Sequence, residues 1–263
     1  MPKAYSKEIL QTAYDLITVK EYSANKAAKE LGIDCGTMRK RLKEQFGLEF
    51  LPDGKKQVDS HYFDTIDTEE KAYWLGFLTA DGYVSDINNI ELCLAETDKE
   101  HIEKFKKAIS SKHSIGLKKV TVDGKVFLSY RISIKDTVMA NALRSYGLTS
   151  DKSYTAYIPE IPNEFMRHYI RGLFDGDGSI MTRASNHNLF DISIISGSPQ
   201  MIDDFCNVVK KYIGIDMNIR ITRGLTEARL SHQYKIKSFV DWIYGESTIY
   251  LDRKHNKIAA VLG

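Results

Sequence analysis

Two stretches of the sequence, W-L-G-F-L-T-A-D-G at residues 74–82 and I-R-G-L-F-D-G-D-G at residues 170–178, decide the fold. Each closes a mostly apolar segment, carries small residues four positions apart and ends on Asp-Gly. Residues four apart share one face of a helix, and small ones there let two helix backbones approach closely. The pair therefore predicts two helices in close contact, each ending at a glycine that we expect in the left-handed conformation, Gly82 and Gly178.

The similarity between the two stretches continues along the chain. Residues 90–105 resemble residues 190–205, both with the pattern of a strand, a turn and a helix, and residues 132–136 resemble residues 234–238. A repeat of this length indicates two copies of one structural unit. We therefore predict an α+β fold with two pseudo-symmetric αββαββα halves, residues 61–160 and 161–263, and antiparallel saddle-shaped sheets.

Polar and apolar side chains alternate along the predicted strands of both halves, so that Met217, Ile219 and Ile221 alternate with Asn218, Arg220 and Thr222. Such a period indicates that one face of each sheet packs on helices while the other meets solvent or a ligand. The polar face carries groups that can hydrogen-bond to base edges, and an ordinary hydrated sheet face is the alternative. The candidate DNA-binding side chains are Lys118, Arg131, Ser133, Arg183, Arg220, Thr222, Arg229, Ser231 and Gln233.

Asp81 and Asp177 occupy the same position in the two copies of the motif. The C-terminal end of a helix is already negative, so two carboxylates meeting there repel unless a cation joins them. Carboxylate and carbonyl oxygens suit Mg²⁺ or Mn²⁺, and we expect a site formed by both aspartates with the carbonyls of Ala80 and Gly176. A metal at this position suits phosphodiester hydrolysis, because it polarises the phosphoryl oxygen and stabilises the leaving oxygen.

Residues 1–47 are predicted to form three short helices, at 6–18, at 23–31 with Ser23 as the N-cap, and at 35–46. The turn Gly32-Ile33-Asp34 between the second and third helices predicts a helix-turn-helix DNA-binding module, similar to those of transposases and pipsqueak-type proteins. A solvated basic face of an ordinary amphipathic helix is the alternative. Residues 48–60, with a proline, glycines and adjacent lysines, are predicted to be a linker. The candidate DNA-binding residues of the third helix are Arg39, Lys40, Arg41 and Lys43.

The paired stretches at 74–82 and 170–178 resemble the two signatures of single-chain LAGLIDADG homing endonucleases, and the resemblance covers residues 61–263. It implies that Asp81 and Asp177 bind the catalytic metal and that an aligned basic residue near the end of each half, Lys152 or Lys254, assists cleavage. The first motif departs from the signature at Thr79, where the second has Asp175. In the family this position packs or caps rather than cuts, so we still expect activity.

The resemblance implies a metal-dependent DNA endonuclease that makes a staggered double-strand break in a long, asymmetric duplex target, with a role in a mobile element such as intron homing. We expect a monomer, because one chain supplies both halves of the site. The alternative is a protein that binds nucleic acid on the same fold without cleavage, either a regulator of the WhiA type or an RNA maturase.

Composition agrees with an intracellular, cytoplasmic protein that acts on DNA. The 263 residues are 43% hydrophobic, enough for a sizeable core, and neither an apolar N-terminal segment nor a membrane span is recognisable. The net charge of +2 is too small to identify a nucleic-acid partner by itself. Three separated cysteines predict neither a disulfide framework nor a zinc site, so any metal has oxygen ligands.

Overall fold

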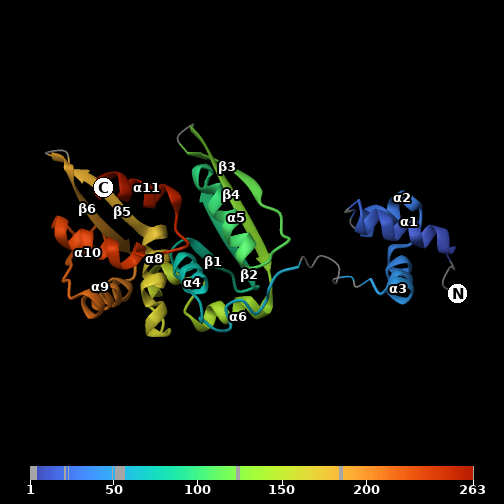
Figure 1. Ribbon diagram of the computed structural model, residues 1–263, viewed down its shortest axis with the longest axis horizontal. Coiled ribbons are helices and arrows are strands. Elements are labelled where there is room, and N and C mark those ends of the chain that lie inside the picture. The colour runs from blue at the N-terminus through green and yellow to red at the C-terminus, as the bar shows by residue number, and fades with distance from the viewer. Residues whose placement is uncertain are drawn as a thin grey trace. The chain divides into compact units, whose positions relative to one another are not determined.

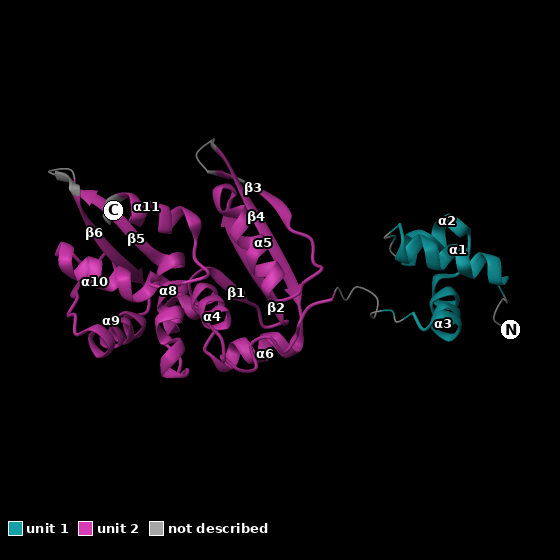
Figure 2. Cartoon of the chain, viewed as in Figure 1, with its two compact units in different colours: residues 1–55 teal, residues 56–263 magenta. Residues whose placement is uncertain are grey.

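The computed structural model describes residues 5–20, 22, 24–48, 50, 57–122, 125–183 and 186–262, without the side chains of residues 120, 122, 125, 186–188, 261 and 262. The chain forms two compact units, residues 1–55 and 56–263 (Figure 2). The predicted N-cap Ser23 and residues 51–56 of the predicted linker lie outside the described residues. Within the described part, no helix has the length and apolar character that crossing a bilayer requires.

The first unit contains three helices, α1 (Lys7–Thr18), α2 (Ala24–Leu31) and α3 (Cys35–Phe46). Side chains cap two of them, because Ser6 accepts from the backbone N–H of Ile9 and Asp34 from that of Thr37. The helix α3 ends at Gly47, whose φ of 65° is the left-handed conformation that suits glycine. A small core joins the three helices and consists of Leu10, Ala13, Ala24, Ala28, Met38 and Leu42.

The second unit contains two four-stranded antiparallel sheets, which confirms the predicted α+β fold. The strand order is β1-β2-β4-β3 in the first sheet and β5-β6-β8-β7 in the second. The first half runs α4 (Glu69–Asp81), β1 (Gly82–Val84), β2 (Asn89–Ala95), α5 (Lys99–Ala108), β3 (Gly116–Val122), β4 (Lys125–Lys135), α6 (Thr137–Ser145) and α7 (Lys152–Thr155). The second half runs α8 (Met166–Asp177), β5 (Gly178–Arg183), β6 (Asn186–Ser196), α9 (Pro199–Ile213), β7 (Asn218–Thr222), β8 (Leu225–Leu230), α10 (Gln233–Tyr244) and α11 (Asp252–Leu262).

Helices α4 and α8 pack against each other between the two sheets (Figure 1). A Cβ at Gly76 would overlap the carbonyl oxygen of Tyr169, and a Cβ at Gly172 would overlap that of Tyr73. The close backbone contact predicted from the small residues is therefore confirmed, because no larger side chain fits at either position. Both helices are buried on nearly every side, and one continuous core extends from them into both sheets.

The alternation along β7 does not give the buried face that it predicts. Ile219 and Ile221 are 49% and 78% exposed, and all five residues of the strand lie at the surface. β7 is the edge strand of the second sheet and pairs only with β8. Helices α9 and α10 cover the inner strands β6 and β8, so the apolar side chains of β7 lie beyond that cover.

Candidate active site

Each of the two repeated stretches ends its helix on an aspartate. Asp81 is the last residue of α4 and Asp177 the last of α8, and a strand begins at the next residue in both halves. The glycines there, Gly82 and Gly178, have φ of −77° and −69°, so the predicted left-handed conformation is wrong. Glycine is needed for space instead, because a Cβ at Gly82 would lie 2.6 Å from the carbonyl oxygen of Leu78.

The two helix ends meet. A Cβ at Gly176 would overlap the Cβ of Ala80 and would lie 3.3 Å from Oδ2 of Asp81. The side chains of Asp81 and Asp177 are exposed to solvent, whereas the helices behind them are buried. The structure therefore brings the two predicted carboxylates to one water-accessible place on the surface of the second unit.

The surroundings of these carboxylates favour their protonated forms. Water reaches both side chains, but protein fills most of the space around them, and this desolvation followed by the charge of Asp177 raises the pKa of Asp81 to about 6. Desolvation also raises the pKa of Asp177, and in both cases the positive charges of Lys152 and Lys254 oppose the shift. The two carboxylates therefore carry poorly hydrated negative charge, which a bound cation would stabilise.

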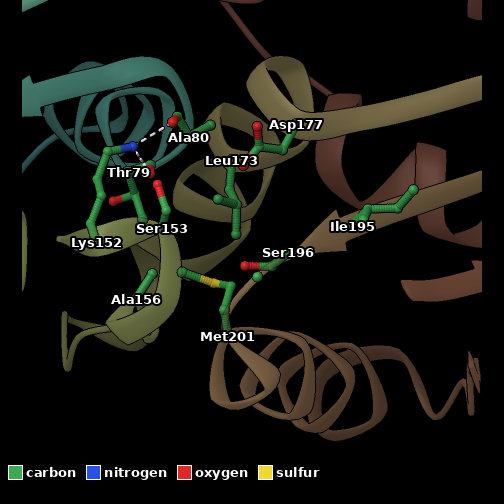
Figure 3. Close-up of a pocket in the computed structure, with 11 residues that line it drawn as sticks. Thr79, Ala80, Lys152, Ser153, Ala156, Leu173, Asp177, Ile195, Ser196 and Met201 are labelled. Carbon is green, nitrogen blue, oxygen red and sulfur yellow. Dashed lines mark hydrogen bonds between the residues drawn. The ribbon is translucent and has the colours of Figure 1, made fainter. Parts of the chain in front are cut away.

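Lys152 lies at the end of α4. It begins the short helix α7, and its Nζ donates to the carbonyl oxygen of Thr79 at 2.6 Å and to that of Ala80. Figure 3 shows the ammonium directed at the end of α4, with Asp177 on the other side of a small pocket. That pocket has a volume of about 170 Å³ and is lined by Thr79, Ala80, Lys152, Ser153, Ala156, Leu173, Asp177, Ile195, Ser196, Gly197 and Met201.

Lys254 occupies the corresponding place at the end of α8. It lies in the first turn of α11 and is 6% exposed. Its Nζ donates to the carbonyl oxygens of Phe174, Asp175 and Gly176 at 2.6, 2.6 and 3.1 Å, which engages all three of its N–H groups. Desolvation lowers the pKa of Lys254 to about 8.

The two lysines already supply positive charge to the negative helix ends, a role that the sequence suggested only for a metal. They also differ, because Lys152 has two acceptors among the described residues and borders the pocket, whereas Lys254 has three and is buried. One N–H of Lys152 therefore stays available to a ligand. The sequence aligned the lysines correctly but could not show this difference.

The donor set fits a divalent cation that is shared with a substrate. Within the described residues, no group of three His, Cys, Asp or Glu side chains could hold a metal alone. Mg²⁺ commonly binds through one or two carboxylates together with water and substrate phosphate, and Asp81 and Asp177 match that pattern. The carbonyls of Ala80 and Gly176 each accept from a lysine, so they have one lone pair left for a metal.

Hydroxyl groups connect the two helices behind the site in a reciprocal pattern. Tyr73 of α4 donates to Asp175 of α8 at 2.8 Å, and Tyr169 of α8 donates to Thr79 of α4 at 3.1 Å. Asp175 is fully buried and also accepts from Tyr244 and from a backbone N–H. This position packs the core in both motifs, so the departure at Thr79 removes no group from the surface site.

Arg171 fastens the second motif to the first, and nothing in the sequence pattern predicted it. Its guanidinium is fully buried and lies 2.6 Å from Oε1 of Glu69 at the start of α4. It also donates to the carbonyl oxygens of Ile243 and Ile249 and lies 2.9 Å from Nδ1 of His168. A buried arginine with this many partners fixes one relative position of the two helices.

The predicted DNA-binding residues of the first sheet lie on its solvent face. Lys118 and Arg131 are exposed, and Ser133 is half-buried. Arg131 lies 3.6 Å from Glu91, which also accepts from Ser133. The carboxylate of Glu91 was not among the sequence candidates and reduces the positive charge of this face.

The arginines predicted on the second sheet also lie beside carboxylates that the sequence left unassigned. Arg183 and Arg229 both pair with Asp191, and Arg220 pairs with Glu227. Asp191 and Glu227 are 4% and 3% exposed, so the arginines cover them. The period-two pattern showed which residues share this face but not which of them form ion pairs.

Two other candidates on the second sheet lie outside its strands. β8 ends at Leu230, so Ser231 is beyond the strand and Gln233 is the first residue of α10. The amide of Gln233 hydrogen-bonds to the backbone N–H and carbonyl of Phe190, which fastens α10 to β6. The expectation that these residues continue the strand alternation is wrong, whereas Thr222 is exposed on β7 as expected.

The basic residues of the first unit lie on α3. Lys40 and Lys43 are exposed, and Arg39 and Arg41 are half-buried. Arg41 pairs with Glu44 at 3.0 Å, one turn along the same helix. Nothing in the structure of this unit tests its role, so the helix-turn-helix assignment stays a prediction.

Comparison with known proteins identifies the fold of the second unit. Residues 164–244 match the LAGLIDADG-like domain, and residues 70–138 match the WhiA LAGLIDADG-like domain. The homing endonuclease I-WcaI, solved bound to its DNA recognition sequence, is 10% identical, with a TM-score of 0.54 over 81% of this chain and 96% of that chain. The sequence has no match among curated proteins.

Two further solved structures are similar at lower TM-scores. Full-length WhiA from Thermatoga maritima is 16% identical, with a TM-score of 0.47 over 77% of this chain and 70% of that chain. I-DmoI in complex with DNA and Mn is 17% identical, with a TM-score of 0.44 over 72% of this chain and 98% of that chain. The chain has a LAGLIDADG fold with one LAGLIDADG-like domain in each half, a fold that homing endonucleases share with WhiA.

Proposed function

We propose that the protein is a metal-dependent DNA endonuclease that makes a staggered double-strand break in a long, asymmetric duplex. The observation that carries this proposal is the meeting of two exposed carboxylates, Asp81 and Asp177, at the ends of two helices that are otherwise buried. Buried structural aspartates have hydrogen-bond donors, as Asp175 does, whereas these two face solvent. Their placement costs stability and is best explained by a ligand.

The residues of the site have separate roles in this proposal. Asp81 and Asp177 would hold Mg²⁺ or Mn²⁺, which when bound polarises the scissile phosphate and stabilises the leaving oxygen. Lys152 donates its remaining N–H to a phosphate oxygen from the edge of the pocket, where it offsets charge that develops during hydrolysis. Lys254 holds the end of α8 in place through the three carbonyls that it contacts.

The two sheets and the first unit would bind the duplex. Side chains on the solvent faces of the sheets contact bases and phosphates, and the basic helix α3 adds contacts to a neighbouring stretch of DNA. One chain supplies both aspartates, so we propose a monomer. Action on DNA places the protein inside the cell, and the family resemblance suggests a role in a mobile element.

The test is cleavage of a target selected from a randomised plasmid library in Mg²⁺. The double variant Asp81→Asn with Asp177→Asn is expected to bind the selected duplex but to lose nicking and linearisation. The matched control is Asp241→Asn, which neutralises an exposed carboxylate on α10 that pairs with Lys237. Cleavage by the double variant at the rate of the control would show that the proposed site is wrong.

A second candidate is a DNA-binding regulator that does not cut. Two observations favour it: the first half matches the WhiA LAGLIDADG-like domain, and lysines contact the carbonyls expected at a metal. This candidate predicts selective duplex binding that needs no divalent cation, with no nick in the selected target. Cation-dependent cutting of that target would exclude it.

A further inference from the structure

The solvent face of the second sheet carries two carboxylates that arginines cover. Asp191 lies on β6 and Glu227 on β8, and both are almost fully buried although they belong to the face without helices. Burying a carboxylate is costly unless charged donors surround it. The arginines above them, Arg183, Arg220 and Arg229, are therefore held in place from below.

Asp191 binds two arginines at once. Its Oδ1 accepts from Nε and Nη2 of Arg183 at 3.1 and 2.7 Å, and its Oδ2 accepts from Nη2 of Arg229. Arg183 also donates to the carbonyl oxygen of Ser231. Burial alone would raise the pKa of Asp191, but the hydrogen bonds from Arg183, Arg229 and Ser231 outweigh it and lower that pKa to about 2.

The number of N–H groups left over differs among the three arginines. A bidentate contact with guanine needs two parallel N–H groups from one guanidinium edge. Arg183 donates from Nε and Nη2 to Asp191 and Ser231, so only its Nη1 is left for a ligand. Among the described contacts, Arg229 uses one N–H of Nη2 and Arg220 uses Nε, so each guanidinium keeps one edge with two N–H groups for a ligand.

A shallow apolar pocket adjoins Arg220. It has a volume of about 230 Å³ and is lined by Ile195, Arg220, Thr222, Arg223, Leu225 and Glu227. Ile195 and Leu225 are each 42% exposed. Apolar side chains beside a guanidinium match the methyl group of a thymine next to a guanine in the major groove.

The first sheet is arranged differently. Arg131 lies 3.6 Å from Glu91, a long and partly exposed ion pair, and Lys118 has no ion-pair partner among the described residues. A lysine or a loosely held arginine acts as a mobile positive charge, which suits phosphates better than base edges. The two halves therefore offer DNA different chemistry despite their common fold.

We propose that the second sheet reads bases, with Arg229 and Arg220 each recognising a guanine and Asp191 and Glu227 acting as positioning residues beneath them, while the first sheet holds phosphates. This inference rests on the DNA-binding part of the proposed function and not on cleavage. Arg220 reads a guanine that has a thymine beside it, because of the adjoining apolar pocket. Each guanine contact contributes discrimination of about tenfold over adenine.

The test uses the full chain with Ca²⁺ in place of Mg²⁺, so that binding is measured without cleavage. A preferred duplex is selected from a randomised pool, and binding is compared with duplexes that carry single guanine-to-adenine changes. Arg229→Lys and Arg220→Lys keep the charge but lose the paired N–H groups. Each is expected to lose about tenfold discrimination at one guanine while affinity for random duplex stays within about twofold. Deoxyuridine at the thymine beside the Arg220 guanine is expected to weaken binding about fourfold.

Variants of the two carboxylates are expected to change affinity and guanine discrimination in opposite directions, which a purely structural role would not produce. Glu227→Gln and Asp191→Asn remove negative charge from the DNA-binding face but release the arginines. Affinity for random duplex is therefore expected to rise while guanine discrimination falls, whereas general damage to the fold would lower both. The matched control is Asp241→Asn, which removes an exposed carboxylate on α10, and tryptophan-fluorescence melting checks that each variant folds.

The outcomes separate this inference from the proposed function. Full discrimination at every guanine in Arg229→Lys and Arg220→Lys would overturn the inference. Selective binding without any cutting in Mg²⁺ would refute the endonuclease and leave the base-reading sheet intact. A chain that selects no duplex at all would refute both.

Discussion

His101 is expected to make the second unit sensitive to acid. It lies on α5, is 2% exposed, and its Nε2 is 2.9 Å from the hydroxyl of Tyr73. Its Nδ1 has no hydrogen-bond partner among the described residues. The centroid of the imidazole ring lies 4.8 Å from that of Trp74 and 4.6 Å from that of Phe77. Burial followed by the charge of Lys104 lowers the pKa of His101 from 6.5 to about 3.

The sign of the effect follows from proton uptake by the unfolded chain. Between pH 6.5 and about 3 the unfolded state binds a proton at His101 that the folded state does not, so acid lowers the free energy of unfolding. From pH 7 to pH 5 the expected loss is about 2 kcal/mol. His101→Phe removes this loss but also removes one hydrogen bond, which costs about 1 kcal/mol at pH 7. The free energies of unfolding of the variant and the wild type are therefore expected to be equal at about pH 6.

The assay is urea unfolding followed by tryptophan fluorescence at pH 5, 6 and 7. The chain has two tryptophans, Trp74 and Trp242, and both belong to the second unit, so the signal reports that unit alone. The control is His61→Gln, because a hydrogen bond from His61 to Asp64 raises the pKa of this exposed histidine. Removal of His61 is therefore expected to increase the loss of unfolding free energy at low pH, whereas removal of His101 decreases it. Parallel pH profiles of His101→Phe and the wild type would refute the reasoning.

Three further predictions concern the helix contact, the lysines and the first unit. Gly172→Ala is expected to cost about 3 kcal/mol of unfolding free energy, because the added methyl overlaps the Tyr73 carbonyl; a change below about 0.5 kcal/mol in urea unfolding would contradict the packing. Lys152→Met is expected to slow nicking about 100-fold with a smaller loss of stability than Lys254→Met, which loses about 2 kcal/mol; equal effects of the two on melting and nicking would contradict their assigned difference. Deletion of residues 1–50 is expected to weaken DNA binding and flatten its salt dependence, and an unchanged salt slope would exclude a DNA contact by this unit.

The sequence was sufficient to predict the fold because the motif is repeated. One apolar helix ending at Asp-Gly has many explanations, but two copies with small residues at matching positions require close contact, as Gly76 and Gly172 show. The same repeat placed Asp81 and Asp177 at equivalent positions. The conformation of Gly82 was mispredicted, because the usual helix-ending glycine continues into a loop whereas this one begins a strand.

The partners of charged groups could not be predicted, because they depend on distant parts of the chain. Alignment located Lys152, but its acceptors Thr79 and Ala80 lie more than 70 residues earlier and become neighbours only in the folded unit. The pairing of Asp191 with Arg229 likewise joins two different strands. The alternation that included Gln233 failed because a period of two does not show where a strand ends.

The ion pair of buried Arg171 with half-buried Glu69 makes the two halves non-interchangeable. The position of Arg171 in the second motif corresponds to Leu75 in the first, and that of Glu69 corresponds to Phe165. An assembly of two first halves would place the half-buried Glu69 opposite a leucine, and an assembly of two second halves would bury the arginine without a carboxylate. The second error would leave an uncompensated buried charge, at a cost of about 3–5 kcal/mol. A half of this chain, once separated, should therefore recombine with its own complement in preference to a copy of itself.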